Sequence, residues 1–586
     1  MVSKRHALVA VALGVTVALA GCVNVPTGGR VVSGTAPERA PVDDPYVRLI
    51  PVPPGRNWSK SQIVQGFLTA SAAFDDGHAV ARKYLAPKTK WEPTNRPGIT
   101  VYDRPLTIAE LTDRVEVTGR QLGTISTDGQ YLAYPDKIDE VFQLAKDAHG
   151  QWRITALPNQ LLTGMLLGQR DVERAFRTLN LYYFAPDGKV LVPNPIYLPL
   201  MNRPELPSQL VRAALGGPTS WLTKAVRSDF PPDTKLLGKG VDVTDGVATV
   251  NLSKEAMGGS LSGMSAQLMW TLRQLPEVTR LRLQIDGETM SPPGMGATQS
   301  PSDWRHNDAD KVPPREAGQS APVYLSGDDG QFEQLKGDLP QRVDPSGRTR
   351  LHRPAISLDE KSVAGLNESG DTVLQGDIGR DAPRPVLHAP DPGGRFIAPT
   401  WDRSGTLWML ENYGDRSRLW IKEKNKEPVE VHEWDLSPNH VMALRVARDG
   451  VRIAAIAKTG ERAQLQMGRI LWEFGVPTVA QFLFLGSEIV NAKDLAWRNA
   501  DELVVLGSTQ RQPNVVPYQV PVSGGPLRVI GSGGTDMTSI TALPGSPVLV
   551  GMRAENADKI CRQHDENDPI SEWDCFAKGQ APAYPG

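Results

Sequence analysis

The chain has 586 residues, which is enough for about three or four domains of ordinary size. It carries 64 Lys and Arg against 66 Asp and Glu, and no segment gathers its basic residues into a stripe, so nucleic acid is not an expected partner. The 55 Gly and 49 Pro residues make up about 18% of the chain, against roughly 12% in an average protein, which favours turns, long loops and linkers over helical bundles.

The first 21 residues have the pattern of a secretory signal peptide. Lys4 and Arg5 precede an uncharged apolar stretch from Ala7 to Ala20. This stretch is shorter than the roughly 20 apolar residues that a membrane-spanning helix needs, and small residues follow it. We therefore expect residues 1–21 to direct export and to be removed.

Leu19, Ala20, Gly21 and Cys22 resemble the lipobox of bacterial lipoproteins. The resemblance implies that a diacylglyceryl group is attached to the Cys22 thiol and that cleavage occurs before this residue. Two or more acyl chains hold a protein stably, because each buried CH₂ contributes about 0.8 kcal/mol. We expect a lipid anchor at Cys22 on the outer face of the cytoplasmic membrane. Residues 22–54 would form a flexible tether.

Two further cysteines, Cys561 and Cys575, remain near the end of the sequence. An even pair in an exported protein favours a disulfide, and two free thiols are the alternative. No CxxC motif surrounds either residue, so a redox function is not indicated.

Residues 55–177 are expected to form a small α+β domain. Apolar residues recur at helical spacing after Ser59, a plausible N-cap, and a second short helix is expected from Ala79 to Leu85. Alternating strands are expected at 115–117, 131–134, 141–144 and 152–154. A helix pair followed by an antiparallel sheet resembles the NTF2-like fold.

Residues 178–290 combine two strands, a helix, a hairpin, a long helix and a closing strand. The helices are expected at 207–215 and 262–275, and the strands at 181–184, 190–192, 241–243, 248–253 and 281–287. A Gly-Pro after the first helix, the Asp245-Gly246 turn and the Val-x-Leu-Ser strand that follows it resemble the GerMN domain of germination and sporulation proteins. An unrelated α/β domain is the alternative.

Residues 291–321 are rich in Pro, Ser, Gly and charge and are interpreted as a linker. From 322 to 586 a weak repeat recurs every 44 to 51 residues or so, which is the size of a β-propeller blade. The repeats start at Ala355, Ala398, Leu444, Leu495 and Thr541. We expect five or six blades, one of them formed by strands near Val323 and 332–335 together with the C-terminus; a pair of β-sandwiches is the alternative.

No catalytic, metal-binding or cofactor-binding residue is predicted. The 9 His residues are scattered, no HExxH or P-loop occurs, and 259–263 resembles a GxSxG elbow only superficially. We therefore expect a protein that is not an enzyme and holds no cofactor.

Lipobox, tether, α+β domain, GerMN-like domain and β-propeller, in this order, resemble the actinobacterial LpqB lipoprotein family, most closely from Asn180 to Pro199. The resemblance implies a multidomain α+β and all-β protein that contacts the extracytoplasmic domain of an Mtr-type sensor histidine kinase. It would modulate a two-component system in cell-envelope homeostasis and division. The alternatives are a module that binds cell-wall material, such as peptidoglycan fragments, and an enzyme acting in the propeller channel.

Overall fold

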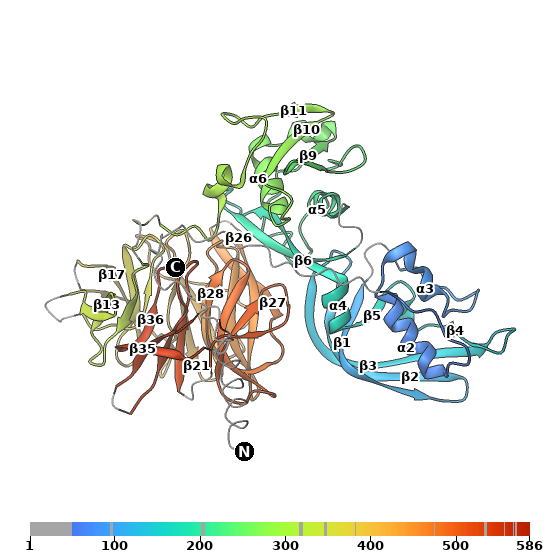
Figure 1. Cartoon of the computed structure of the whole chain (residues 1–586). Coiled ribbons are helices and arrows are strands. Elements are labelled where there is room, and N and C mark those ends of the chain that lie inside the picture. The colour runs from blue at the N-terminus through green and yellow to red at the C-terminus, as the bar shows by residue number, and fades with distance from the viewer. Residues whose placement is uncertain are drawn as a thin grey trace, which may run out of the picture. The chain divides into compact units, whose positions relative to one another are not determined.

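The computed structural model describes residues 50–586, without 94–97, 201–204, 314, 316–319, 345–348, 381, 474, 533–535, 556, 566–567 and 569–570. The signal peptide, Cys22 and most of the tether lie outside the described residues. Among the described residues, no helix has the length and apolar character needed to cross a bilayer. Strands dominate the described chain, and helices concentrate in its first half (Figure 1).

Helix α2 (Lys60–Ser71) starts at a capping box formed by Ser59 and Gln62. The Ser59 hydroxyl accepts a hydrogen bond from the Gln62 amide, and the Gln62 side chain accepts one from the Ser59 amide at 2.9 Å. The predicted N-cap is therefore confirmed. Phe67, on the buried face of α2, packs edge-on against Trp91 and Phe142, which fixes the helix on the sheet.

The sheet beneath α2 has the strand order β3-β2-β1-β5, with β4 paired to β3. The remaining short helices of this part are η1 (Asp75–His78), α3 (Ala79–Arg82), η2 (Asn159–Leu161) and α4 (Gln169–Ala175). The strands are β1 (Ile99–Glu110), β2 (Arg114–Ile125), β3 (Tyr131–Lys146), β4 (Trp152–Ala156) and β5 (Met165–Gly168).

Strand β3 corrects the sequence prediction, which placed two strands at 131–134 and 141–144. The polar residues between them stay in the ladder, because β3 pairs with β2 from Tyr131 to Gln143 with one bulge. Strand β1 was not predicted, since its middle residues carry no apolar alternation and it is interrupted by a bulge after Asp103.

The GerMN-like part contains a hairpin, a four-stranded sheet and two main helices. Strands β6 and β7 form the hairpin, and β9 and β10 pair in parallel on either side of α6 in the chain. Most predicted elements are confirmed; β11 was not predicted. The bounds are β6 (Phe176–Phe184), β7 (Leu191–Pro199), α5 (Leu206–Leu215), β8 (Asp242–Thr244), β9 (Val247–Leu252), η4 (Lys254–Gly258), α6 (Leu261–Leu272), β10 (Arg280–Ile285) and β11 (Glu288–Met290).

The segment 291–321, interpreted as a linker, contains the 3₁₀ helix η5 (Pro301–Asn307). Its Trp304 is 2% exposed and belongs to the same apolar core as α6 and β10. The Trp270 indole N–H donates to the Trp304 carbonyl at 3.3 Å. Trp304 therefore helps to attach this polar segment to the GerMN-like core, together with the backbone bridge between Gln299 and Leu281.

Six four-stranded blades form the propeller in the described part of the chain, which confirms the expected architecture. Blade two has a split inner strand, β19 and β20, and blade six joins β36 to β12, β13 and β14. The innermost strands of the six blades are β15 (His352–Ile356), β19 (Arg395–Phe396) with β20 (Thr400–Trp401), β24 (Val441–Val446), β28 (Ile489–Asn499), β32 (Met537–Thr541) and β36 (Gln580–Ala583).

The remaining blade strands lie progressively further out. Blade one continues with β16 (Ser362–Leu366), β17 (Thr372–Asp377) and β18 (Arg384–His388), and blade two with β21 (Leu407–Tyr413), β22 (Arg416–Lys422) and β23 (Val429–Glu430). Blade three continues with β25 (Arg452–Thr459), β26 (Arg462–Glu473) and β27 (Val476–Phe484), and blade four with β29 (Glu502–Thr509), β30 (Val516–Pro521) and β31 (Arg528–Val529). Blade five continues with β33 (Leu549–Met552), β34 (Lys559–Gln563) and β35 (Trp573–Lys578), and blade six with β12 (Tyr324–Ser326), β13 (Phe332–Lys336) and β14 (Leu339–Arg342).

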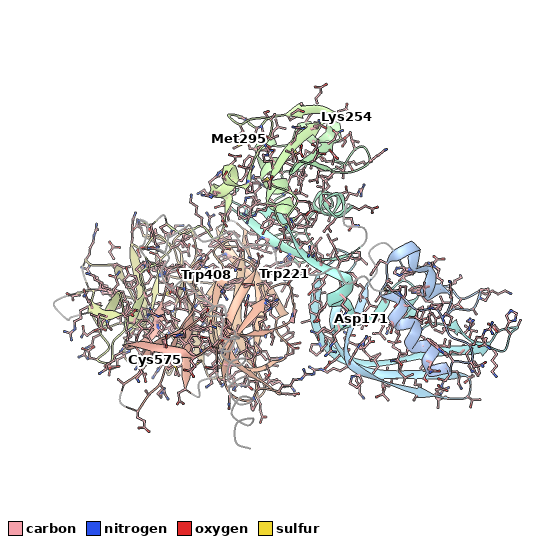
Figure 2. The ribbon with its side chains drawn as sticks, viewed as in Figure 1. Asp171, Trp221, Lys254, Met295, Trp408 and Cys575 are labelled. Carbon is pink, nitrogen blue, oxygen red and sulfur yellow. A yellow bond between two sulfur atoms is a disulfide. The ribbon has the colours of Figure 1, made fainter. Side chains whose placement is uncertain are left out.

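Aspartates make the tight turns that follow inner strands. Asp402 accepts hydrogen bonds from the amides of Ser404 and Thr406, and its second oxygen accepts from the buried Trp408 indole. Trp408 lies inside the propeller (Figure 2). Asp449 accepts from the amide of Val451 in the next blade. Side chains that satisfy turn amides explain why a polar turn follows the repeat motif.

Replacing Trp304 with Ala tests the attachment of η5. We expect Trp304→Ala to lower the free energy of unfolding by about 3–5 kcal/mol, because it opens a cavity in a closed core. Urea unfolding followed by tryptophan fluorescence and circular dichroism measures the loss. Arg305→Ala, an exposed neighbour on the same helix, is the control. Equal stability of the two variants would contradict the packing described.

Candidate ligand-binding channel

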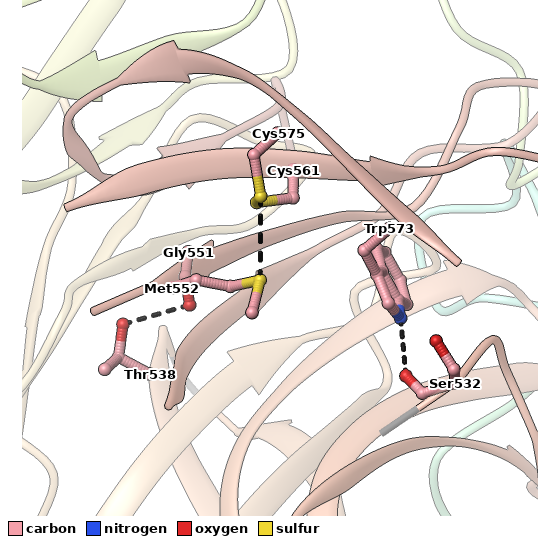
Figure 3. The surroundings of a disulfide bond; sticks show 7 residues. All are labelled: Ser532, Thr538, Gly551, Met552, Cys561, Trp573 and Cys575. Carbon is pink, nitrogen blue, oxygen red and sulfur yellow. Dashed lines mark hydrogen bonds between the residues drawn. A yellow bond between two sulfur atoms is a disulfide. The ribbon is translucent and has the colours of Figure 1, made fainter. Parts of the chain in front are cut away.

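Of the residues singled out from the sequence, Cys22 lies outside the described residues, whereas Cys561 and Cys575 form a disulfide. The two cysteines face each other on β34 and β35 in blade five, with Cα atoms 4.0 Å apart. Cys561 is fully buried, and the Met552 sulfur lies 3.8 Å from the Cys575 sulfur (Figure 3). The bond joins two outer strands and takes no part in the channel described next.

A hollow lies where the inner strands of all six blades of the propeller meet. It has a volume of about 1000 Å³, and its wall includes residues of β15, β19, β20, β24, β28, β32 and β36. We call this hollow the channel. Because every inner strand contributes to it, the channel exists only when the ring of blades is closed.

Cations outnumber carboxylates on the channel wall. The basic side chains are Arg353, Arg395, Arg445, Arg448, Lys493 and Arg553. The acidic side chains are Glu368, Asp494 and Asp558. The chain as a whole carries a formal charge of −2, so the excess of positive charge is a local property of this wall.

Asp494 connects the inner strands of three consecutive blades. It lies on β28, accepts a hydrogen bond from the Ile540 amide on β32 at 2.9 Å, and has its other oxygen 3.6 Å from the Arg445 guanidinium on β24. Both of its oxygens therefore have partners within the wall. This carboxylate stabilises the ring and neutralises one of the six cations.

Arg448 also connects three blades, from a buried position. Its guanidinium donates to the carbonyls of Trp497 and Ala542 at 3.3 and 3.4 Å, while only 7% of the residue is exposed. Burial lowers the pKa of Arg448 below its ordinary value. The side chain brings positive charge to the wall with little solvation of its own.

Irregular backbone on the inner strands shapes the wall. Strand β15 has a register shift between His352 and Ala355, and Arg353, between them, has a φ of 51°. Ala581 on β36, the strand beside β15, has a φ of 47°. A bulge re-aims side chains, and left-handed backbone in a residue other than glycine persists only where the surroundings hold it.

Histidines and metal-ligating side chains are the groups of the channel wall with the clearest link to chemistry. In the described part of its wall, His440 contacts the Gly414 carbonyl, and no histidine is hydrogen-bonded to a serine or a carboxylate. Nowhere in the described residues do three or more His, Cys, Asp or Glu side chains gather as metal ligands do.

The sequence analysis missed the basic residues of the channel. A signal for them exists, since Arg353, Arg395, Arg445 and Lys493 each lie within three residues of the start of a repeat motif. This common position indicates a shared channel wall only once the motif is known to form the innermost strand of each blade.

Comparisons with known proteins cover the whole chain. Family models match at 53–173 (lipoprotein LpqB, N-terminal domain), 180–291 (sporulation and spore germination) and 329–585 (lipoprotein LpqB beta-propeller domain). Lipoprotein LpqB of Thermobifida fusca is 34% identical, with 97% of each chain covered. The chain belongs to the LpqB lipoprotein family. Lipoprotein LpqB of Streptomyces coelicolor is 30% identical, with 99% of this chain and 98% of the relative covered.

Solved structures resemble parts of this LpqB family member. TolB from Acinetobacter baumannii covers 53% of this chain and 84% of its own, at 12% identity and a TM-score of 0.36. The tandem GerMN domains of GerM from Bacillus subtilis cover 30% of this chain and 63% of their own, at 21% identity and a TM-score of 0.19. The family resemblance and the multidomain α+β and all-β fold class predicted from sequence are confirmed.

Removing the Asp494 carboxylate tests its role in the ring. We expect Asp494→Ala to lower the free energy of unfolding by about 2–3 kcal/mol, because the Ile540 amide and the Arg445 guanidinium both lose a charged partner. Asp494→Asn keeps an oxygen that accepts from the Ile540 amide, so it should lower the free energy of unfolding clearly less than Asp494→Ala does. Chemical denaturation of the two variants measures the difference. Identical losses would show that the inter-blade hydrogen bond contributes nothing.

Removing the disulfide tests the reinforcement of blade five. Cys561→Ser combined with Cys575→Ser should lower the free energy of unfolding by about 3 kcal/mol, the value for a loop of this length. Thermal unfolding of the oxidised protein, the reduced protein and the double variant measures the effect. Reduction and substitution should shift the midpoint alike, and an unchanged midpoint would contradict the prediction.

Proposed function

We propose that this protein is an extracytoplasmic lipoprotein that modulates a two-component sensor histidine kinase of the Mtr type. In this role it contacts the extracytoplasmic domain of the kinase and adjusts signalling in cell-envelope homeostasis and division. The observation that carries the proposal is membership of the LpqB family over nearly the full chain.

Membrane attachment is part of the proposal. The motif Leu19-Ala20-Gly21-Cys22 supplies a thiol for lipid attachment, and the relatives carry the name lipoprotein. About 30 residues separate Cys22 from the described domains, and a flexible segment of that length has a root-mean-square reach of roughly 30 Å. The folded part is then held close enough to the membrane to meet a sensor domain.

The described surface favours a polar contact with the sensor. Leu339, Val429, Val476 and Val529 are among the exposed large apolar side chains, and each lies on the outermost strand of a different blade. Single apolar side chains of this kind are ordinary surface features, whereas a dominant apolar contact requires a contiguous patch. We therefore expect charged and polar groups to carry much of the affinity and its dependence on salt.

Direct binding is the test. Residues 22–586 with Cys22→Ser are titrated with the extracytoplasmic domain of the Mtr-type kinase from the same organism, using isothermal titration calorimetry. We expect a Kd of about 10 µM or tighter. The Kd should rise about tenfold or more between roughly 50 and 500 mM salt, since exposed charges are screened.

Specificity is controlled with the extracytoplasmic domain of an unrelated sensor kinase, which should not bind. Absence of binding to the Mtr-type domain at concentrations near 1 mM would rule out direct contact, since such a complex would be worth less than about 4 kcal/mol. The function would then be the alternative one, recognition of cell-wall material.

A further inference from the structure

We propose that the propeller channel binds an extended acidic peptide, with the carboxylates of the peptide held by the channel arginines. The inference goes beyond the proposed function, because it assigns a ligand to the channel whether or not a sensor kinase is the partner. It depends on residues of the propeller alone.

The first argument is the balance of charge. Asp494 already has partners for both oxygens, while Arg353 and Arg553 form no ion pair or side-chain hydrogen bond with any described residue. Both arginines are exposed to the channel and available to a ligand. A guanidinium presents a planar set of donors that matches a carboxylate in two parallel hydrogen bonds.

The second argument is a set of buried polar atoms that lack partners. The Ser326 hydroxyl, the Arg448 Nε and the Ser539 hydroxyl are all buried without a hydrogen bond among the described residues, and all three residues line the channel. Arg448 and Ser326 are more than nine-tenths buried. Such atoms normally have partners in folded proteins, because each one left unpaired costs about 1–3 kcal/mol. All three can donate, and a small side-chain movement toward the channel would bring each of them to an acceptor of the ligand.

The third argument is the placement of Arg353. Arg353 has a left-handed backbone and lies within the bulge of β15. A residue of a regular strand has an extended backbone without such strain. Residues held in this way cluster at sites of function rather than in structural strands. The bulge therefore fixes where the backbone of Arg353 lies on the channel wall.

The wall favours a peptide over a phosphate-bearing polymer. Glu368 and Asp558 also line the channel, and their carboxylates can accept hydrogen bonds from the N–H groups of a peptide, which a polyphosphate chain lacks. A volume of about 1000 Å³ also exceeds what one small anion fills and suits a chain of several residues. The experiment distinguishes a ligand that carries carboxylates from one that carries phosphates.

The experiment uses fluorescein-labelled hexaglutamate as the probe and residues 22–586 with Cys22→Ser as the protein. Fluorescence anisotropy measures the Kd, which we expect at about 100 µM or tighter at low salt. Arg353→Gln combined with Arg553→Gln should weaken binding about tenfold or more. Both side chains are exposed and lack partners among the described residues, so the variant should fold, and its circular dichroism and melting temperature verify this.

The matched control removes the same charge elsewhere in the propeller. Arg384 and Arg528 lie on the outermost strands β18 and β31, outside the channel wall. The double variant Arg384→Gln, Arg528→Gln should leave the Kd for the probe within about twofold of the unchanged protein. Equal weakening by both double variants would overturn the proposal, since it would reduce binding to net charge.

Two competitors complete the test. Unlabelled hexaglutamate should displace the probe, and hexaglutamine of the same length should not. Displacement by hexaglutamine, or failure of the probe to bind at all, would overturn the proposal. Displacement by inorganic tripolyphosphate at lower concentration than by hexaglutamate would also overturn it and assign the channel to phosphate-bearing ligands.

Discussion

The pairing of β36 with β12 is the interaction on which the propeller depends. These strands lie more than 250 residues apart in the sequence and form one blade, with Tyr324 opposite Ala583 and Ser326 opposite Gln580. The Tyr584 hydroxyl then donates to the Pro547 carbonyl of blade five, and the Gly586 amide donates to the Ile356 carbonyl of blade one. The closing blade is thereby bonded to both neighbours, and the ring leaves only the short, protected edges of a propeller.

Closure also determines what the channel can do. Cations from several blades point to one axis only because the ring is complete, and their mutual repulsion is offset by Asp494 and by the carbonyls around Arg448. The indole N–H groups of Trp401 and Trp497 each donate to a carbonyl on the preceding inner strand, which fixes the spacing of neighbouring blades. The positions of the blades, and with them the backbone that carries the arginines, are therefore fixed before a ligand arrives.

Much of the fold could be predicted from local pattern, and most of the candidate site could not. The cap at Ser59 and the blade repeats follow from spacing along the chain, because a helix start and a strand period are local properties. The burial of Trp304 is a tertiary effect, since its neighbours in sequence are polar. The channel arginines escaped prediction because residues about 45 apart become neighbours only after closure. The closing pair itself, the C-terminus with the strands near Val323 and Phe332, was predicted and is confirmed.

Native-state hydrogen exchange of the mature chain tests the closure most directly. If β36 completes blade six, the amides of 324–326 and those of Gln580 and Ala583 are protected together, at the level of the inner strands of the other blades. Rapid exchange throughout 580–583, as in a free segment, while 441–446 stays protected, would contradict the closed ring and with it the channel.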